Sequence, residues 1–241
     1  TKQEVAVGVS VGLQPTDEEL ARKVGTFIEK GYSRIKLKIK PGRDVQMVAS
    51  IRERYPNTQI MVDANSAYTL QDMEVLKELD TLDLMMIEQP LAYDDYLDHA
   101  RLQQELQTPI CLDESIRSVR DAKLALELGS CRIINIKPGR VGGIASSKAI
   151  HDFCLAKKIP VWCGGMLESG VGRAHNVALA SLPGFVLPGD ISESQRYWAE
   201  DIVEPEFTMD NGHVQVPTGQ GIGVAVLEDL VTKLTVETAV F

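Results

Sequence analysis

The sequence predicts an α/β protein, a TIM-like (β/α)7β barrel of parallel strands followed by an irregular C-terminal tail. Three observations lead to this fold class. Eight strand patterns alternate strictly with seven helix patterns at a repeat of about 25 residues, as in parallel sheets with right-handed crossovers. Several strand patterns are apolar on both faces, as expected of a sheet covered by helices. The length of 241 residues also suits one α/β barrel, which typically has about 250.

The strand patterns are apolar runs, and the first of them alternates with period two. They cover residues 4–13, 34–40, 59–64, 84–89, 109–113, 132–137, 160–164 and 185–191. Local signals bound the helices: Thr16 is a capping residue followed by three acidic residues, and the second helix pattern ends before Pro56. The helix patterns cover residues 16–31, 44–55, 70–79, 93–106, 119–129, 144–158 and 171–182.

An open, doubly wound sheet is the alternative arrangement of such alternating elements. It would require a glycine-rich first turn, which residues 12–16 do not provide, so we favour the barrel. The alternation ends after Ser192, and residues 204–241 carry turn signals and a short strand pattern at 213–216. We therefore predict a catalytic barrel domain over residues 1–203. Residues 204–241 form a tail that packs on the barrel or on another domain.

Composition excludes several classes of protein. The chain has 25 Lys and Arg against 34 Asp and Glu, a net charge of −9, which disfavours nucleic-acid binding. No apolar run approaches the roughly 20 residues that span a bilayer, and no signal peptide is visible. The four cysteines form no CxxC pair, so we expect reduced, buried thiols in a cytoplasmic protein.

Five charged residues recur at one phase of the repeat. They stand 25, 25, 25 and 24 positions apart, each at the C-terminal end of a predicted strand: Lys38, Asp63, Glu88, Asp113 and Lys137. In a barrel these side chains would meet at the mouth, where active sites are built. Three adjacent carboxylates repel one another unless a cation lies among them.

The three acids indicate a site for Mg²⁺, with Mn²⁺ as a possible substitute. They supply oxygen ligands only, which suits Mg²⁺ better than Zn²⁺. Asn65 and Glu114 lie beside two of these acids in the sequence and are candidates to orient them. The alternative interpretation is a network of ion pairs with the lysines and no metal.

Lys36 and Lys38 are two positions apart on one strand and therefore share a face. We expect that face to be the barrel interior, because lysines in the helix layer would be costly to bury. Two close ammonium groups and partial burial would lower the pKa of each amine, which would suit a general base. Lys137, four strands further on, would face them across the cavity.

These motifs resemble those of the enolase superfamily, muconate-lactonising subgroup. Beyond the charged residues, the run from Gly164 to Gly172 (GGMLESGVG) resembles the o-succinylbenzoate synthase / N-acylamino acid racemase family. The resemblance covers essentially the whole chain. It implies a (β/α)7β barrel, and enzymes of this superfamily use a lysine or histidine base with Mg²⁺.

The resemblance also implies roles for individual residues. Lys38 would take the α-proton of a small carboxylate substrate, with Lys36 lowering its pKa. Lys137 would stabilise the enediolate or act as the acid or base on the opposite face, and the three acids would bind Mg²⁺. The substrate would be held by residues of the loop after the seventh strand and of the eighth strand: Gly165, Met166, Ser169, Asp190 and Ile191.

Family members also carry an N-terminal capping domain that closes the barrel, so we expect one in the intact protein. A homo-oligomer is a further expectation. The leading hypothesis is a lyase of menaquinone synthesis, o-succinylbenzoate synthase. An isomerase, N-acylamino acid (N-succinylamino acid) racemase, is the first alternative because both reactions begin with the same proton abstraction. An inactive barrel without its cap is the second.

Overall fold

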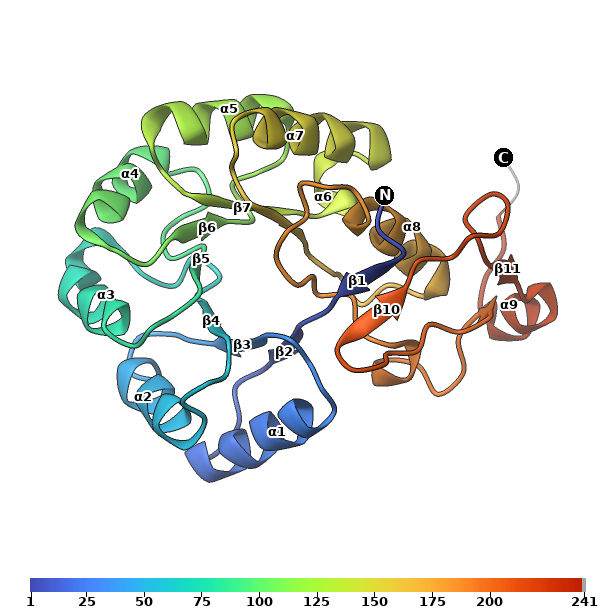
Figure 1. Ribbon diagram of the computed structural model, residues 1–241, viewed down its shortest axis with the longest axis horizontal. Helices are drawn as coiled ribbons and strands as arrows, with labels where there is room; N and C mark the ends of the chain where they lie inside the picture. Colours follow the sequence, from blue (N-terminus) through green and yellow to red (C-terminus); the bar gives the residue numbers. More distant parts are fainter. Residues whose placement is uncertain (240–241) are drawn as a thin grey trace.

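The computed structural model describes residues 1–239, and it confirms a parallel α/β barrel. Seven parallel strands hydrogen-bond in chain order and curve into an arc (Figure 1). They are β2 (Val9–Val11), β3 (Ile35–Lys38), β4 (Ile60–Asp63), β5 (Ile87–Glu88), β6 (Ile110–Leu112), β7 (Ile133–Ile136) and β8 (Val161–Cys163).

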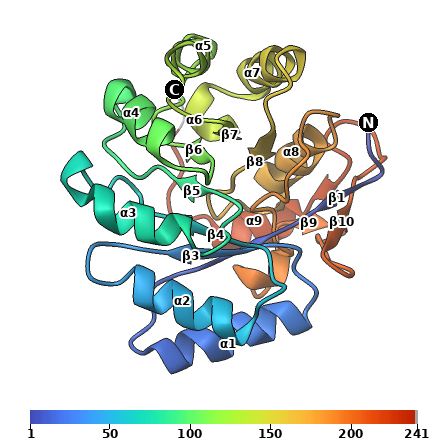
Figure 2. The same ribbon diagram turned by 60° about the vertical axis from the view of Figure 1, so that its left-hand side comes forward.

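Helices surround the outside of this arc (Figure 2), and most of them pack against the next helix along the chain. The seven that connect or follow the strands are α1 (Asp17–Glu29), α2 (Val45–Arg54), α3 (Met73–Asp80), α4 (Tyr96–Glu105), α5 (Val119–Leu128), α7 (Ile144–Ala156) and α8 (Gly170–Ala180). A short helix, α6 (Pro138–Val141), directly follows β7. The predicted cap of α1 is confirmed, since Thr16 Oγ1 accepts a hydrogen bond from the Glu19 N–H at 3.2 Å.

The prediction of a regular eighth strand over residues 185–191 is wrong. This segment makes only two isolated parallel bridges, one joining Phe185 to Val161 and the other Gly189 to Val7. Pro188 lies between them and has no N–H to donate, which interrupts a ladder of hydrogen bonds. The segment nevertheless completes the ring, because the Gly8 N–H donates to the Gly189 carbonyl at 2.8 Å.

The predicted first strand is divided in two. Its first part, β1 (Glu4–Ala6), leaves the ring and pairs antiparallel with β10 (His213–Gln215) of the tail (Figure 1). β9 (Val203–Glu204) spans the predicted boundary and pairs with β11 (Ala225–Val226) of the tail, which also contains the helix α9 (Glu228–Leu234). The tail therefore contacts the barrel through the N-terminal strand, while the domain boundary at residue 203 stays a prediction.

Side chains alternate along each strand between the helix layer and the barrel interior. On β3, Ile35 and Leu37 belong to the core beneath the helices, and the two lysines face inward, as predicted. A separate small core fills the interior: Met61, Met86, Cys111, Ile133 and Trp162. Two positions further along three of these strands, on the same inward face, polar side chains replace the apolar ones: Asp63 follows Met61, Glu88 follows Met86 and Asp113 follows Cys111. This layering makes the C-terminal mouth the polar end of the barrel.

Candidate active site

The three predicted acids lie together at the C-terminal mouth. Asp63 and Glu88 are direct neighbours in the parallel register of β4 and β5, and Asp113 immediately follows β6. Each carboxylate is at most 2 % exposed. Buried carboxylates need compensating charge, so their partners define the chemistry of the site.

Lysines supply that charge from two sides. Lys38 Nζ lies 2.6 Å from Asp63 Oδ2, and Lys137 Nζ lies 2.8 Å from Asp113 Oδ2. Lys36, two positions before Lys38 on β3, places its Nζ 3.4 Å from Asp63 Oδ2 and 3.2 Å from Glu88 Oε2. The structure therefore brings all five predicted charges, together with Lys36, into one cluster.

The pKa directions in this cluster reflect burial and neighbouring charge. Burial raises the pKa of Glu88 to about 8; Lys36 opposes this, while Asp63 and Asp113 add to it. Burial alone would lower the pKa of Lys36, but nearby carboxylates, with Asp190 the strongest, hold it well above its ordinary value. The expectation that Lys36 has a lowered pKa is therefore wrong, because three neighbouring carboxylates outweigh burial and the repulsion from Arg34.

The donor set fits a hard divalent cation. Three buried carboxylates converge from adjacent strand ends and supply the oxygen ligands that Mg²⁺ prefers. Within residues 1–239, however, no three His, Cys, Asp or Glu side chains stand in an arrangement ready to hold a metal. Ammonium groups of the lysines contact the carboxylate oxygens, so a bound cation would have to replace these contacts.

Asn65 and Glu114 join this cluster at its outer edge. Asn65 accepts a hydrogen bond from Lys38 Nζ at 2.5 Å and donates to Glu114 Oε1 at 2.9 Å. The backbone N–H of Asn65 also donates to Asp63 Oδ1 at 3.0 Å. Glu114 Oε2 is buried and has no hydrogen-bond partner. Both residues therefore lie where they can orient Lys38 and Asp63.

The five predicted substrate-binding residues fall into two groups, three on the wall of a cavity and two outside it. A cavity of about 300 Å³ opens at the mouth, lined by Ser10, Lys36, Lys38, Lys137, Gly165, Met166, Leu167, Glu168, Asp190, Ser192 and Tyr197. Gly165, Met166 and Asp190 thus lie on its wall. Ser169 is outside this lining set and precedes α8, and Ile191 is buried in the core beneath the helices.

Asp190 lines the cavity, but both of its carboxylate oxygens are bound to cations of the barrel interior. Its two oxygens are held by Arg34 Nη2 at 2.8 Å and by Lys36 Nζ at 2.6 Å, and these cations hold its pKa below the ordinary range against the effect of burial. Sequence reasoning missed Arg34, which is fully buried. The signal was present, because Arg34, Lys36 and Lys38 alternate on one face of the strand.

Two further polar residues were also missed. Asn135 Nδ2 donates to Glu88 Oε1 at 2.8 Å, and Arg140 of α6 pairs with the second oxygen of Asp113. Asn135 stands two positions before Lys137, so the alternation of β7 was the available signal. Arg140 has no periodic signal, because it lies on a short helix outside the strand repeat.

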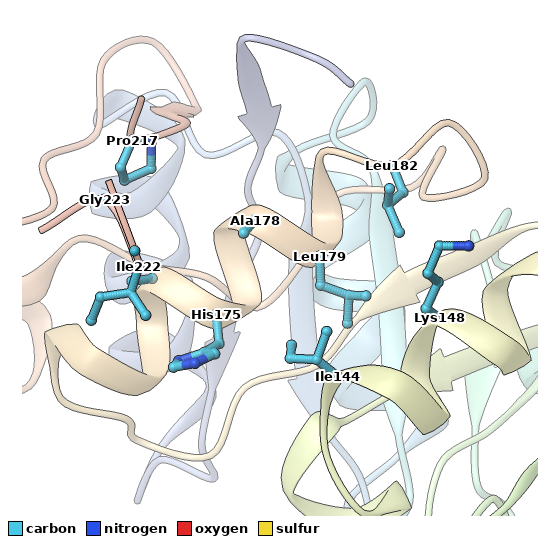
Figure 3. A pocket seen from close by; sticks show the side chains of 11 residues that line it. Ile144, Lys148, His175, Ala178, Leu179, Leu182, Pro217, Ile222 and Gly223 are labelled. Carbon is cyan, nitrogen blue, oxygen red and sulfur yellow. The ribbon is translucent and has the colours of Figure 1, made fainter. Parts of the chain in front are cut away.

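A larger cavity of about 410 Å³ lies elsewhere, between α7, α8 and residues 217–223 (Figure 3). Its lining is mainly apolar, and Lys148 and His175 are its ionisable members. Lys148 Nζ is already 2.6 Å from Asp152 Oδ2. This cavity lacks the convergent charges of the barrel mouth, so we assign the chemistry to the mouth.

Comparisons with known proteins agree with this assignment of fold. A family model described as "Enolase C-terminal domain-like" matches residues 19–230. An o-succinylbenzoate synthase from Geobacillus kaustophilus is 56 % identical over 235 residues, covering 98 % of this chain and 63 % of its own length. An N-succinylamino acid racemase from Thermus thermophilus is 53 % identical over 234 residues, covering 97 % of this chain and 63 % of its own.

A solved structure gives the same result. The crystal structure of an enolase-superfamily member from Listeria innocua superposes with a TM-score of 0.94 at 52 % identity, over 97 % of this chain and 63 % of that one. The chain thus spans less than two thirds of the length of each of these three relatives. None of the helices in residues 1–239 has the length and apolar character needed to cross a bilayer.

Proposed function

This chain belongs to the enolase C-terminal domain-like family, and we propose that the intact protein is a Mg²⁺-dependent o-succinylbenzoate synthase. One observation carries the proton-abstraction chemistry of this proposal: Lys38 at the end of β3 and Lys137 after β7 both reach the carboxylate cluster. A substrate carboxylate seated between them would present its α-carbon to an amine on either side. This arrangement is suited to proton removal next to a carboxylate.

The residues divide the work as follows. Lys38, as the free amine, takes the α-proton of a succinyl-hydroxycyclohexadiene carboxylate. The C–O bond to the hydroxyl group then breaks, and the hydroxide leaves as water with that proton while the ring becomes aromatic. Asp63, Glu88 and Asp113 would hold Mg²⁺, or Mn²⁺, which would neutralise the charge that develops on the substrate carboxylate.

Lys137 and the neighbours of Lys38 complete the site. The Lys137 ammonium, raised in pKa by Asp113 and Glu88 against the effect of burial, remains charged and stabilises negative charge on the substrate. Asn65 orients Lys38 through the 2.5 Å hydrogen bond. The wall at Gly165 and Met166 would contact the part of the substrate that does not react.

Racemisation of N-succinylamino acids is the second candidate. The racemase from Thermus thermophilus is nearly as similar to this chain as the synthase. The same pair of lysines would serve, with Lys38 removing the α-proton on one face and Lys137 returning one on the other. The two activities share the first step, so the lysine geometry favours neither.

Two features of the intact protein also belong to this proposal. We infer a capping domain over the mouth, because Met166 and Leu167 expose 58 % and 65 % of their surface beside the cavity. A cytoplasmic location is suggested by four buried cysteines that are all free thiols. Homo-oligomer formation stays a prediction.

The test is to measure turnover of both substrates by the intact protein with Mg²⁺. We expect dehydration to exceed racemisation, and Lys38→Ala to lower both by at least about 100-fold, since it removes the base. Lys148→Ala, which removes a surface lysine on α7, is the matched control and should leave both rates unchanged. Turnover of neither substrate by the wild type would favour the inactive barrel.

A further inference from the structure

The loop between β8 and α8 forms one wall of the mouth cavity. Residues 165–168 line the cavity in an unbroken run, together with Lys36 and Lys38. Leu167 adopts a left-handed backbone conformation, with φ at 59°. A side chain other than glycine rarely adopts this conformation, and it persists only where surrounding contacts hold it.

Contacts within the loop account for part of this restraint. Glu168 Oε1 accepts hydrogen bonds from the Met166 N–H and from Asn176 Nδ2 of α8, both at 2.9 Å. These bonds fold the loop onto the first turns of α8. They do not by themselves fix the loop relative to the rest of the mouth.

Further restraint comes from α8 and from the segment that follows residues 185–191, which closes the ring. The Glu168 carbonyl accepts two hydrogen bonds at 3.0 Å, one from Arg173 Nη2 and one from Trp198 Nε1. Arg173 is buried and also donates to the Ser192 carbonyl. Asp201 Oδ1, further along the segment, accepts from the Gly170 N–H at the start of α8 at 2.7 Å.

We propose that Trp198 is a positioning residue, which acts with Arg173 to hold the Glu168 carbonyl and thereby the 165–168 wall of the substrate cavity. Trp198 is not among the residues that line the cavity, so it acts through the loop. The identity of the substrate rests on the proposed function, whereas the restraint of the loop does not. Loss of the Trp198 hydrogen bond would therefore weaken binding of the non-reacting part of the substrate and leave proton transfer at Lys38 intact.

Trp198→Phe in the intact protein tests this proposal, because it keeps an aromatic ring and removes the indole N–H. Trp198 is 42 % exposed, so the variant should fold. Tyr55→Phe is the matched control: it also deletes one aromatic donor to a backbone carbonyl, that of Ala21, at 3.0 Å, where α1 meets α2. Both variants are measured by peptide-level hydrogen exchange and by steady-state kinetics.

We expect amide exchange across residues 165–169 to become roughly threefold to tenfold faster in Trp198→Phe, the effect of losing one hydrogen bond. Exchange in α1 should be unchanged, and Tyr55→Phe should leave the loop at wild-type rates. The KM of Trp198→Phe should rise about threefold or more, with kcat within about twofold of wild type.

Unchanged loop exchange in Trp198→Phe, or equal acceleration in both variants, would overturn the positioning role. So would a fall in kcat at constant KM. If the wild type turns over neither substrate, the proposed function fails, and the exchange comparison still decides the role of Trp198.

Discussion

At the scale of single residues, the charge state of the mouth depends on neighbours that are distant in sequence. Lys36 and Lys38 alone would repel each other, yet Lys36 contacts Asp63, Glu88 and Asp190. Opposite charges within about 4 Å stabilise an ammonium group even when it is buried. Asp63 and Glu88 are also proposed ligands of the cation, so a bound metal ion and Lys36 would interact with the same two carboxylates.

Asp63→Asn should weaken Mg²⁺ binding by at least about tenfold, because it removes one anionic ligand and the ion-pair partner of Lys38. Isothermal titration with Mg²⁺ measures the change. Asp152→Asn is the control: Asp152 also pairs with a lysine, but on the surface of α7. If the wild type binds no Mg²⁺, the charges form a network of ion pairs and the metal site is wrong.

His99 gives a prediction of pH dependence. It is fully buried, its Nε2 accepts the Leu91 N–H at 3.2 Å, and burial lowers its pKa. Below the unfolded pKa of about 6.5, the unfolded state therefore binds more protons than the folded state, and the free energy of unfolding falls as the pH falls.

Compared with His99→Asn, the wild type should lose up to about 1.4 kcal/mol more of its unfolding free energy per pH unit between about pH 6.5 and the lowered folded pKa. Urea denaturation at several pH values measures the difference. His213→Asn, at a partly exposed histidine of the tail, should track the wild type. Parallel pH profiles for the wild type and His99→Asn would contradict the prediction.

At the scale of elements, helices follow local signals more closely than strands do. Ser118 Oγ accepts from the Asp121 N–H at 3.2 Å to begin α5, and Gly129 ends it with a left-handed φ of 74°. Both residues stand at the helix limits that the sequence predicts. The segment at 185–191 also has strand composition, but Pro188 and its closing position in the ring leave only bridges.

Ser118→Ala should lower the free energy of unfolding by about 1 kcal/mol, since it removes the side-chain cap of α5. Ser118→Asp retains an oxygen acceptor and should remain near wild type. Chemical denaturation of both variants provides the measurement. Equal losses in the two variants would mean that capping is not the cause.

At the scale of the whole molecule, the ring is completed by residues from both ends of the chain. Gly8 leaves space for the Arg34 guanidinium, whose Cζ would lie only 2.5 Å from an added Cβ. Arg34 in turn holds Asp190, which contacts Lys36. The site therefore depends on a packing arrangement that spans the first and last barrel segments.

The pairing of β1 with β10 should contribute measurably to stability. Val5 and Val214 are paired across these strands, and both are buried. A double-mutant cycle of Val5→Ala and Val214→Ala should give a coupling energy of about 0.5 kcal/mol or more, as expected for side chains in contact. Additive losses would show that the two ends of the chain stabilise the fold independently.

The alternation of strands and helices, the inward face of Lys36 and Lys38, and the phase that gathers Asp63, Glu88 and Asp113 can all be predicted from the amino-acid sequence. These features follow from periodicity, which a linear chain displays directly. The folded arrangement is needed to see that Asp190 contacts both Arg34 and Lys36, that the ring closes without a regular eighth strand, and that Trp198 contacts the loop. Such contacts join residues more than 25 positions apart outside the repeat, and no local pattern encodes a contact made by the closure of the ring.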